Sequence, residues 1–107
     1  MPVVYRIDKF VVPAPARDEF WANVRRTHSV LRDQPGFLAD TLLEQRSGSG
    51  RFNAVTIVKW SSEDDLAAAK SAVDRSHEAA QFQPVEFFER VGIEADLANY
   101  VDIDAEG

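Results

Sequence analysis

Residues 34–66 read QPGFLADTLLEQRSGSGRFNAVTIVKWSSEDDL, and this stretch decides the fold. A Pro-Gly turn, a strand-length run at 37–45, a Gly-Ser-Gly loop and a second run at 52–60 predict a β-hairpin. Ser62, followed three residues later by Asp65, is typical of a helix N-cap. The stretch therefore predicts a hairpin that leads directly into a helix.

Both faces of this hairpin are apolar. Alternation along the first run separates two sets, Phe37, Ala39, Thr41 and Leu43 against Leu38, Asp40 and Leu42. In the second run the two sets are Phe52, Ala54, Thr56, Val58 and Trp60 against Asn53, Val55, Ile57 and Lys59. An exposed sheet face would be polar, so each face of this sheet needs a cover.

The rest of the chain supplies the other elements of an α+β fold. They are a first strand at 3–12, an amphipathic helix at 16–32, a helix after Ser62, a short helix at 84–91 and a last strand at 97–103. The order β-α-β-β-α-(short α)-β predicts a ferredoxin-like, four-stranded antiparallel sheet with its helices on one face. A second copy of the sheet would cover the other face, which predicts a homodimer.

Composition narrows the possible functions. The chain has 107 residues, so we expect a single domain over 1–107, with a frayed acidic tail at 104–107. There is no cysteine, which excludes disulfides, thiolate metal sites and a cysteine nucleophile. The net charge of −6 argues against nucleic acid, and no run is long enough to cross a membrane. We expect a cytoplasmic protein whose ligand is a small molecule or another protein.

Several segments resemble the antibiotic biosynthesis monooxygenase domain family. They are the turn and strand at 34–45, the strand and helix entry at 51–63, and the helix end Thr27-His28-Ser29-Val30-Leu31-Arg32. The resemblance covers most of 3–73 and the strand near Tyr100. It implies a dimeric α+β barrel, with a cavity between each sheet and its own helices. It is specific for the fold and much less so for the activity.

Two histidines are the main candidate functional residues. His28 follows Val24 by four residues and precedes Leu31 by three, so its ring points toward the sheet. It is either a structural buried histidine or a cavity base that orients or deprotonates a ligand. His77 lies on the inward stripe of the second long helix, and the two rings either line one cavity or lie far apart. With no evident inward carboxylate to complete a ligand set, we expect no metal site.

Four further residues are candidates for substrate binding. Trp60 and Trp21 are either core residues or aromatic walls for a planar ligand, and Trp21 is also a candidate dimer contact. Tyr5 and Asn53 are polar strand residues. They either orient a phenol or quinone oxygen, or bond across strands or at a dimer interface.

The haem-degrading branch of the family is disfavoured. That branch has an asparagine in the first strand, a tryptophan in the second helix and a histidine near that helix's end. Here Arg6 and Asp8 lie near the asparagine position, Ala68 and Ala69 near the tryptophan, and only His77 near the histidine. We therefore expect no cofactor, with haem the disfavoured alternative.

The resemblance implies a cofactor-independent monooxygenase-like protein that binds a small planar aromatic or quinone-type metabolite. In this hypothesis His28 is the base or orienting group, Trp60 and Trp21 are walls, and His77 is a second polar contact. The alternative is a non-catalytic dimeric module for ligand binding or interaction, in which both histidines are structural.

Overall fold

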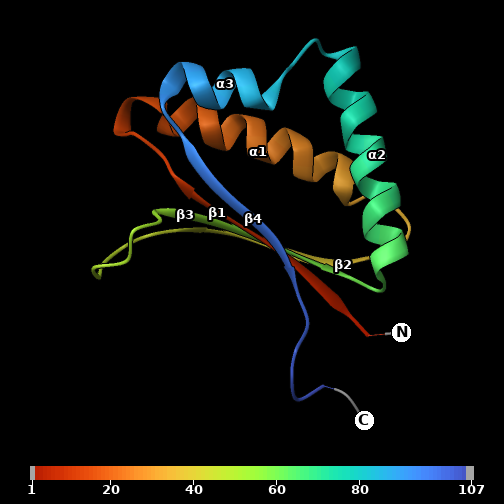
Figure 1. Cartoon of the computed structure of the whole chain (residues 1–107). Coiled ribbons are helices and arrows are strands. Elements are labelled where there is room, and N and C mark those ends of the chain that lie inside the picture. The colour runs from red at the N-terminus through yellow and green to blue at the C-terminus, as the bar shows by residue number, and fades with distance from the viewer. Residues whose placement is uncertain (1, 106–107) are drawn as a thin grey trace.

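The computed structural model describes residues 2–105 and contains one four-stranded sheet with its helices on one side (Figure 1). The strands are β1 (Val4–Val11), β2 (Phe37–Glu44), β3 (Ala54–Trp60) and β4 (Glu94–Tyr100). The helices are the 3-10 turn η1 (Ala14–Ala16), α1 (Arg17–Leu31), α2 (Glu63–Ala79) and the short α3 (Pro84–Val91).

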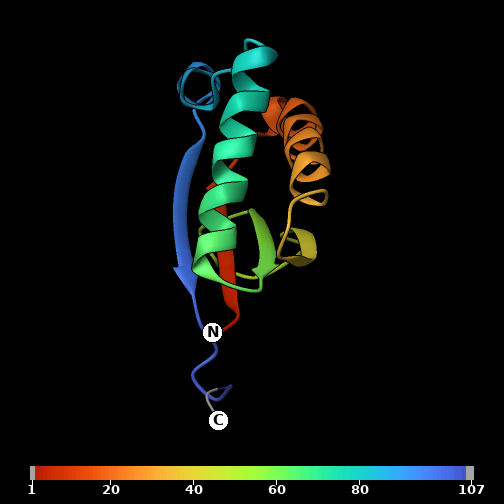
Figure 2. The same cartoon turned by 90° about the vertical axis from the view of Figure 1, so that its right-hand side faces the viewer.

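All neighbouring strands are antiparallel, in the order β2-β3-β1-β4. The turned view shows α1 and α2 side by side along the sheet, with α3 beside the start of β4 (Figure 2). This is the predicted α+β, ferredoxin-like arrangement, and that prediction is confirmed.

The hairpin is anchored where β3 passes into α2. The Ser62 hydroxyl accepts a hydrogen bond from the backbone N–H of Asp65 at 3.1 Å, which is the predicted N-cap. Gly36 has φ +85°, and a Cβ atom there would collide with the Asp65 side chain. Only glycine allows the turn before β2 to pack this closely against the first turn of α2.

One predicted face assignment is wrong. Simple alternation places Phe37 on the same face as Ala39, but an irregularity in the strand register falls between them. Phe37 therefore shares the helix-facing side with Leu42, and its ring packs edge-on against Trp60 at a centroid distance of 5.8 Å. Alternation within a strand is lost where an extra residue is inserted into the ladder.

The last strand begins three residues earlier than predicted and ends at Tyr100. Glu94 pairs with Val11 and Tyr100 pairs with Tyr5, so the polar start of β4 is held by pairing along β1. After Tyr100 the chain leaves the sheet in both views (Figures 1 and 2). Asp104 and Ala105 are exposed, and the remainder of the expected acidic tail, residues 106 and 107, lies outside the described residues.

The core on the helix side divides into two clusters. The larger joins Phe10 of β1 to Phe20 and Trp21 of α1 and Phe87 of α3. The smaller contains Val58, Trp60 and Ala69, and Ala69 is fully buried on the sheet-facing side of α2. Small side chains on this part of α2 bring the helix close to the sheet at one end, and space is left where the clusters meet.

Within residues 2–105, no helix covers the opposite face of the sheet. Ile7 pairs with Ile57 in its centre, and Val55 and Leu43 pair beside them. Leu43 is 47% exposed, so this face is apolar and open in the isolated chain. None of the helices in the described part of the chain is long and apolar enough to span a membrane.

Candidate functional site

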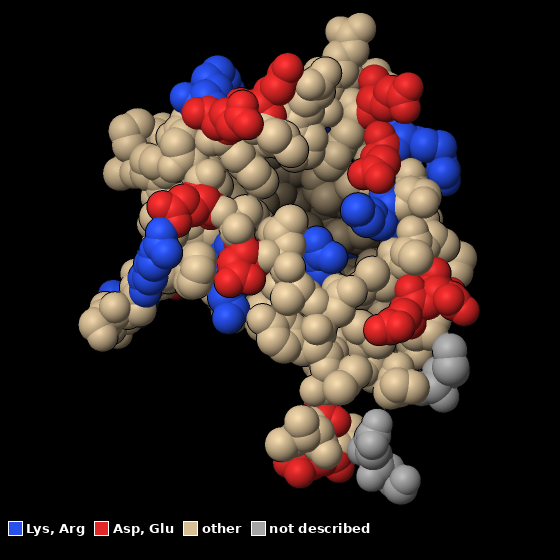
Figure 3. All heavy atoms as spheres, viewed as in Figure 1, with Lys and Arg blue, Asp and Glu red and all other residues tan. Residues whose placement is uncertain are grey.

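A cavity lies between the helices and the sheet, where the two core clusters meet. It has a larger lobe of about 270 Å³ and a smaller lobe of about 140 Å³. The two lobes adjoin each other and share six lining residues: Arg6, Asp8, Thr27, His28, Lys70 and Val73. In the space-filling view the surface is hollowed near its centre, with basic side chains beside the hollow (Figure 3).

The walls are mostly apolar. The larger lobe is lined by aromatic and aliphatic side chains that include Phe10, Phe20, Val24, Phe82, Phe87, Phe88 and Leu97. Around the smaller lobe lie Leu31, Val58, Trp60 and Leu66. Such walls favour a flat apolar ligand, and the few polar groups among them determine how it is oriented.

His28 is the polar group best placed to act on a ligand. It is buried on α1, and its Nδ1 atom lies 2.9 Å from Oδ2 of Asp40 on β2. No buried side-chain nitrogen or oxygen within residues 2–105 lacks a hydrogen-bond partner. Nε2 of His28 has no such partner among these residues, so this atom faces open space, which is the cavity that His28 lines.

The charge of Asp40 determines which tautomer His28 adopts. Burial raises the pKa of Asp40, but hydrogen bonds from His28 and Arg32 outweigh it and hold that pKa below its usual value. An ionised carboxylate can only accept hydrogen bonds, so Nδ1 of His28 carries the proton and donates it. A neutral His28 therefore presents the lone pair of Nε2 to the cavity, as a base requires.

His77 lines the larger lobe too, so the structure brings the two histidines into one cavity. Its Nε2 lies 3.1 Å from the Thr27 hydroxyl, and its ring packs edge-on against Phe82. Burial lowers the pKa of His77, the charge of Asp74 opposes that shift, and Arg26 adds to it. Burial thus favours the neutral form of His77, whose side chain lies at the α2 side of the cavity.

The expectation that no carboxylate faces inward is wrong. Asp8 on β1 lines both lobes, and it is paired with Arg6 at 2.6 Å. Burial raises the pKa of Asp8, and the Arg6 charge and hydrogen bond only partly offset that effect. The signal was present in the alternation of β1, where Arg6 and Asp8 share a face with the buried Val4 and Phe10.

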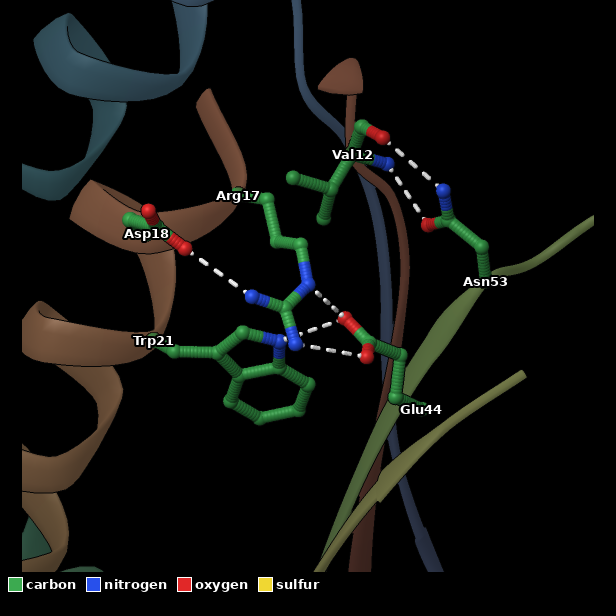
Figure 4. A network of polar contacts seen from close by, with 6 residues as sticks. All are labelled: Val12, Arg17, Asp18, Trp21, Glu44 and Asn53. Carbon is green, nitrogen blue, oxygen red and sulfur yellow. Dashed lines mark hydrogen bonds and ion pairs between the residues drawn. The ribbon is translucent and has the colours of Figure 1, made fainter. Parts of the chain in front are cut away.

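The two tryptophans lie in different places. Trp60 is 2% exposed and forms part of the wall of the smaller lobe. Trp21 packs against Phe20 in the larger core cluster and is not among the lining residues of either lobe. Its indole N–H donates to Glu44 at 3.0 Å, beside the Arg17–Glu44 ion pair (Figure 4).

Tyr5 and Asn53 also lie away from the lining of the cavity. Tyr5 is paired with Lys59, whose ammonium lies 5.8 Å from the centre of the Tyr5 ring. The Asn53 amide donates to the backbone carbonyl of Val12 and accepts from its N–H, both at 2.8 Å (Figure 4). Asn53 therefore continues the β3–β1 pairing beyond the end of β1.

The cavity lining offers few side chains that could hold a metal ion or haem. Among residues 2–105 no three histidine, cysteine or acidic side chains are grouped as a metal site. His77 would be the haem ligand, but its Nε2 is already within hydrogen-bond distance of Thr27.

Comparison with known proteins identifies the family. The sequence model described as antibiotic biosynthesis monooxygenase matches residues 3–82. That is most of the chain, so the protein belongs to the antibiotic biosynthesis monooxygenase family. The predicted family is confirmed, and membership supports a monooxygenase-like function. No curated protein sequence matches the chain.

Solved structures with the same fold include proteins of different activity. SnoaB, a cofactor-independent oxygenase from Streptomyces nogalater, is 23% identical, with a TM-score of 0.64 over 98% of this chain and 97% of its own. MhuD, a haem degrader from Mycobacterium tuberculosis, is 26% identical, with a TM-score of 0.68 over 97% and 99%. A dimeric ferredoxin-like protein from an uncultured marine organism is 11% identical, with a TM-score of 0.70 over 99% and 100%.

Proposed function

We propose that this protein is a cofactor-independent monooxygenase that binds a small planar aromatic or quinone-type metabolite in the cavity. One observation carries the proposal: Nε2 of His28 opens onto an apolar cavity while Nδ1 is held by Asp40. A base oriented by a carboxylate, beside a space shaped for a ring, is what deprotonation of a phenol requires.

The size of the cavity supports a ligand of about two fused rings. One benzene ring occupies a cavity of about 150 Å³, and the larger lobe has about 270 Å³. The smaller lobe, next to Trp60, takes a substituent. In this arrangement the phenylalanines and Trp60 are the walls, and His77 is a second polar contact.

The chemistry begins with proton transfer from the phenol to Nε2 of His28. The ionised Asp40 stabilises the imidazolium that forms, as the carboxylate does in other histidine–carboxylate pairs. The phenolate then supplies the electrons that bind dioxygen to a ring carbon. Loss of water gives the quinone, so that a phenol and dioxygen are converted into a quinone and water.

We also propose that two copies pair through the open face of the sheet. The centre of this face is apolar and is exposed to water in a single copy. It is formed by Ile7, Ile57, Val55 and Leu43. A symmetric dimer buries the same patch of each copy, which is the commonest way to remove such a surface.

The alternative of a haem-binding relative is favoured by one observation, the similarity to MhuD. Absorption spectra of the purified protein with added haemin distinguish it, because ligated haem gives a shifted Soret band. The alternative of a non-catalytic binding module predicts ligand binding with no oxygen uptake.

The experiment that tests the proposal is oxygen uptake with a panel of naphthols in a buffer that contains a chelator. Wild-type protein should consume oxygen and form the naphthoquinone. His28→Ala should lose this activity but still fold, as shown by a cooperative thermal unfolding transition. Full turnover by His28→Ala contradicts the proposed base. Binding of naphthols without oxygen uptake favours the binding module instead.

A further inference from the structure

The connection between α2 and α3 (Figure 1) carries Phe82, and beside it an open groove adjoins the larger lobe of the cavity. The lobe and the groove share four lining residues: Asp74, His77, Phe82 and Pro84. Phe88 lines the lobe but not the groove, and the exposed Val85 lines the groove but not the lobe. Of the side chains that line both spaces, Phe82 is the largest apolar one.

The backbone fixes the position of Phe82 through a Schellman motif at the end of α2. Gln81 adopts the left-handed conformation, with φ +56°, directly after the helix. Its N–H donates to the carbonyl of Glu78 at 3.1 Å, and the N–H of Phe82 donates to the carbonyl of His77 at 2.8 Å. These two hydrogen bonds define the motif, and they turn the chain so that the residue after Gln81 folds back along the helix.

The half-buried ring of Phe82 packs against both helices that the connection joins. It lies edge-on to the His77 ring of α2 at a centroid distance of 5.2 Å, and tilted to the Phe87 ring of α3 at 5.9 Å. On its other side the chain is constrained too, because Pro84 restricts the preceding Gln83 to an extended backbone, observed at φ −118° and ψ 103°. Phe82 is therefore a fixed part of the wall.

We propose that Phe82 determines the length of the ligand that the cavity accepts, because its ring separates the larger lobe from the groove. This proposal rests on the ring-binding function proposed above and adds a residue that sets its specificity. A ring system that fills the lobe meets the Phe82 ring, and a substituent at that end has no path into the groove. Packed apolar walls discriminate against even small additions to a ligand, so this wall excludes longer compounds.

The probes that test this are 2-naphthol and a 2-naphthol that carries a short ethylene glycol chain on the ring without the hydroxyl group. The chain is polar and has to reach water, so a lobe that is enlarged but still separated from the groove does not accommodate it. Naphthols fluoresce when excited at wavelengths that tryptophan does not absorb. Dissociation constants are therefore measured by fluorescence titration for the wild type and four variants.

The variants are Phe82→Ala, Phe82→Leu and the controls Phe88→Ala and Val85→Ala, which enlarge the lobe alone and the groove alone. We expect the wild type to bind the substituted naphthol about tenfold more weakly than 2-naphthol. Phe82→Ala should abolish this difference and Phe82→Leu should reduce it, whereas both controls should retain it. Cooperative thermal unfolding shows that a variant is folded, and Phe82→Leu provides the test if Phe82→Ala does not fold.

Each other outcome contradicts a defined part of the argument. Equal wild-type affinity for the two naphthols overturns the proposal and leaves the ring-binding function standing. So does an unchanged difference in both Phe82 variants. Loss of the difference in Phe88→Ala or Val85→Ala shows that added space on either side is enough, which overturns the separating role of Phe82. Failure of 2-naphthol to bind the wild type overturns the ring-binding function itself.

Discussion

Nδ1 of His28 lies 2.9 Å from the Asp40 carboxylate, and Nε2 of the same ring opens onto the cavity. The two residues come from different elements, α1 and β2, so the pair exists only when the helix packs on the sheet. The Arg32 guanidinium forms an ion pair with the same carboxylate oxygen at 2.9 Å, so Asp40 links Arg32 to His28. This relationship gives the sharpest prediction for activity.

Asp40→Asn should abolish most of the oxygen uptake, although the ring of His28 stays in place. Arg32 donates to the same oxygen, so the asparagine amide keeps its oxygen toward Nδ1, and the substitution removes the negative charge that stabilises the imidazolium formed by proton transfer. We expect a loss of roughly 10²–10⁴-fold in turnover, similar to that of His28→Ala. Asp33→Asn makes the same change at a nearby exposed position and should retain activity. Equal turnover of the Asp40 and Asp33 variants would rule out the orienting role of Asp40.

The lowered pKa of His77 predicts a pH dependence of stability. The unfolded chain binds a proton at His77 near its ordinary pKa of 6.5, while burial keeps the folded side chain neutral to lower pH. Its contribution is therefore complete above the unfolded pKa and is lost as the pH falls through the folded pKa. Urea unfolding between about pH 7.5 and about pH 5.5 should show a steeper loss for the wild type than for His77→Gln. Parallel pH curves would contradict this assignment.

Gly36→Ala should destabilise the fold by about 2–5 kcal/mol, from left-handed strain plus overpacking. Both effects follow from the φ of +85° and from the collision of a Cβ atom with Asp65. Gly48→Ala is the matched control, since Gly48 has φ +101° and open space around it. It should cost only the strain, about 1–2 kcal/mol. Similar urea midpoints for the two variants would show that the contact with Asp65 has no energetic effect.

Ile57→Asp should convert the proposed dimer into a monomer. The substitution places a charge at the centre of the open sheet face, where the two copies would bring like charges together. Sedimentation equilibrium should give the dimer mass for the wild type and the monomer mass for the variant. Val85→Asp, at a 67% exposed position on α3, is the control and should stay dimeric. A monomeric wild type at all concentrations would refute the dimer itself.

The local sequence pattern was sufficient to predict the architecture of the fold. The turn at Gly36, the cap at Ser62 and the two runs between them predict the hairpin and its helix, and the structure has both. These signals are local because turns, caps and alternation act over a few residues. The errors came at the irregularity after Phe37 and at the start of β4, where pairing with another strand overrides the local pattern.

The candidate site depended on packing between distant parts of the chain. Sequence alone indicated that His28 and His77 point inward, and packing placed both in one cavity. The sequence alone showed neither that Asp40 would reach His28 nor that Asp8 would line the same cavity. Trp21 and Asn53 instead bond to Glu44 and Val12, away from the cavity lining.

The sequence by itself therefore determined which elements form and which stripe of each long helix turns inward, because those properties depend on neighbours along the chain. Only the tertiary structure decided which inward residues meet, since a contact between α1 and β2 or between α2 and β1 depends on how whole elements pack. The polar groups of the cavity come from four such elements, and no spacing along the chain records the distances between them.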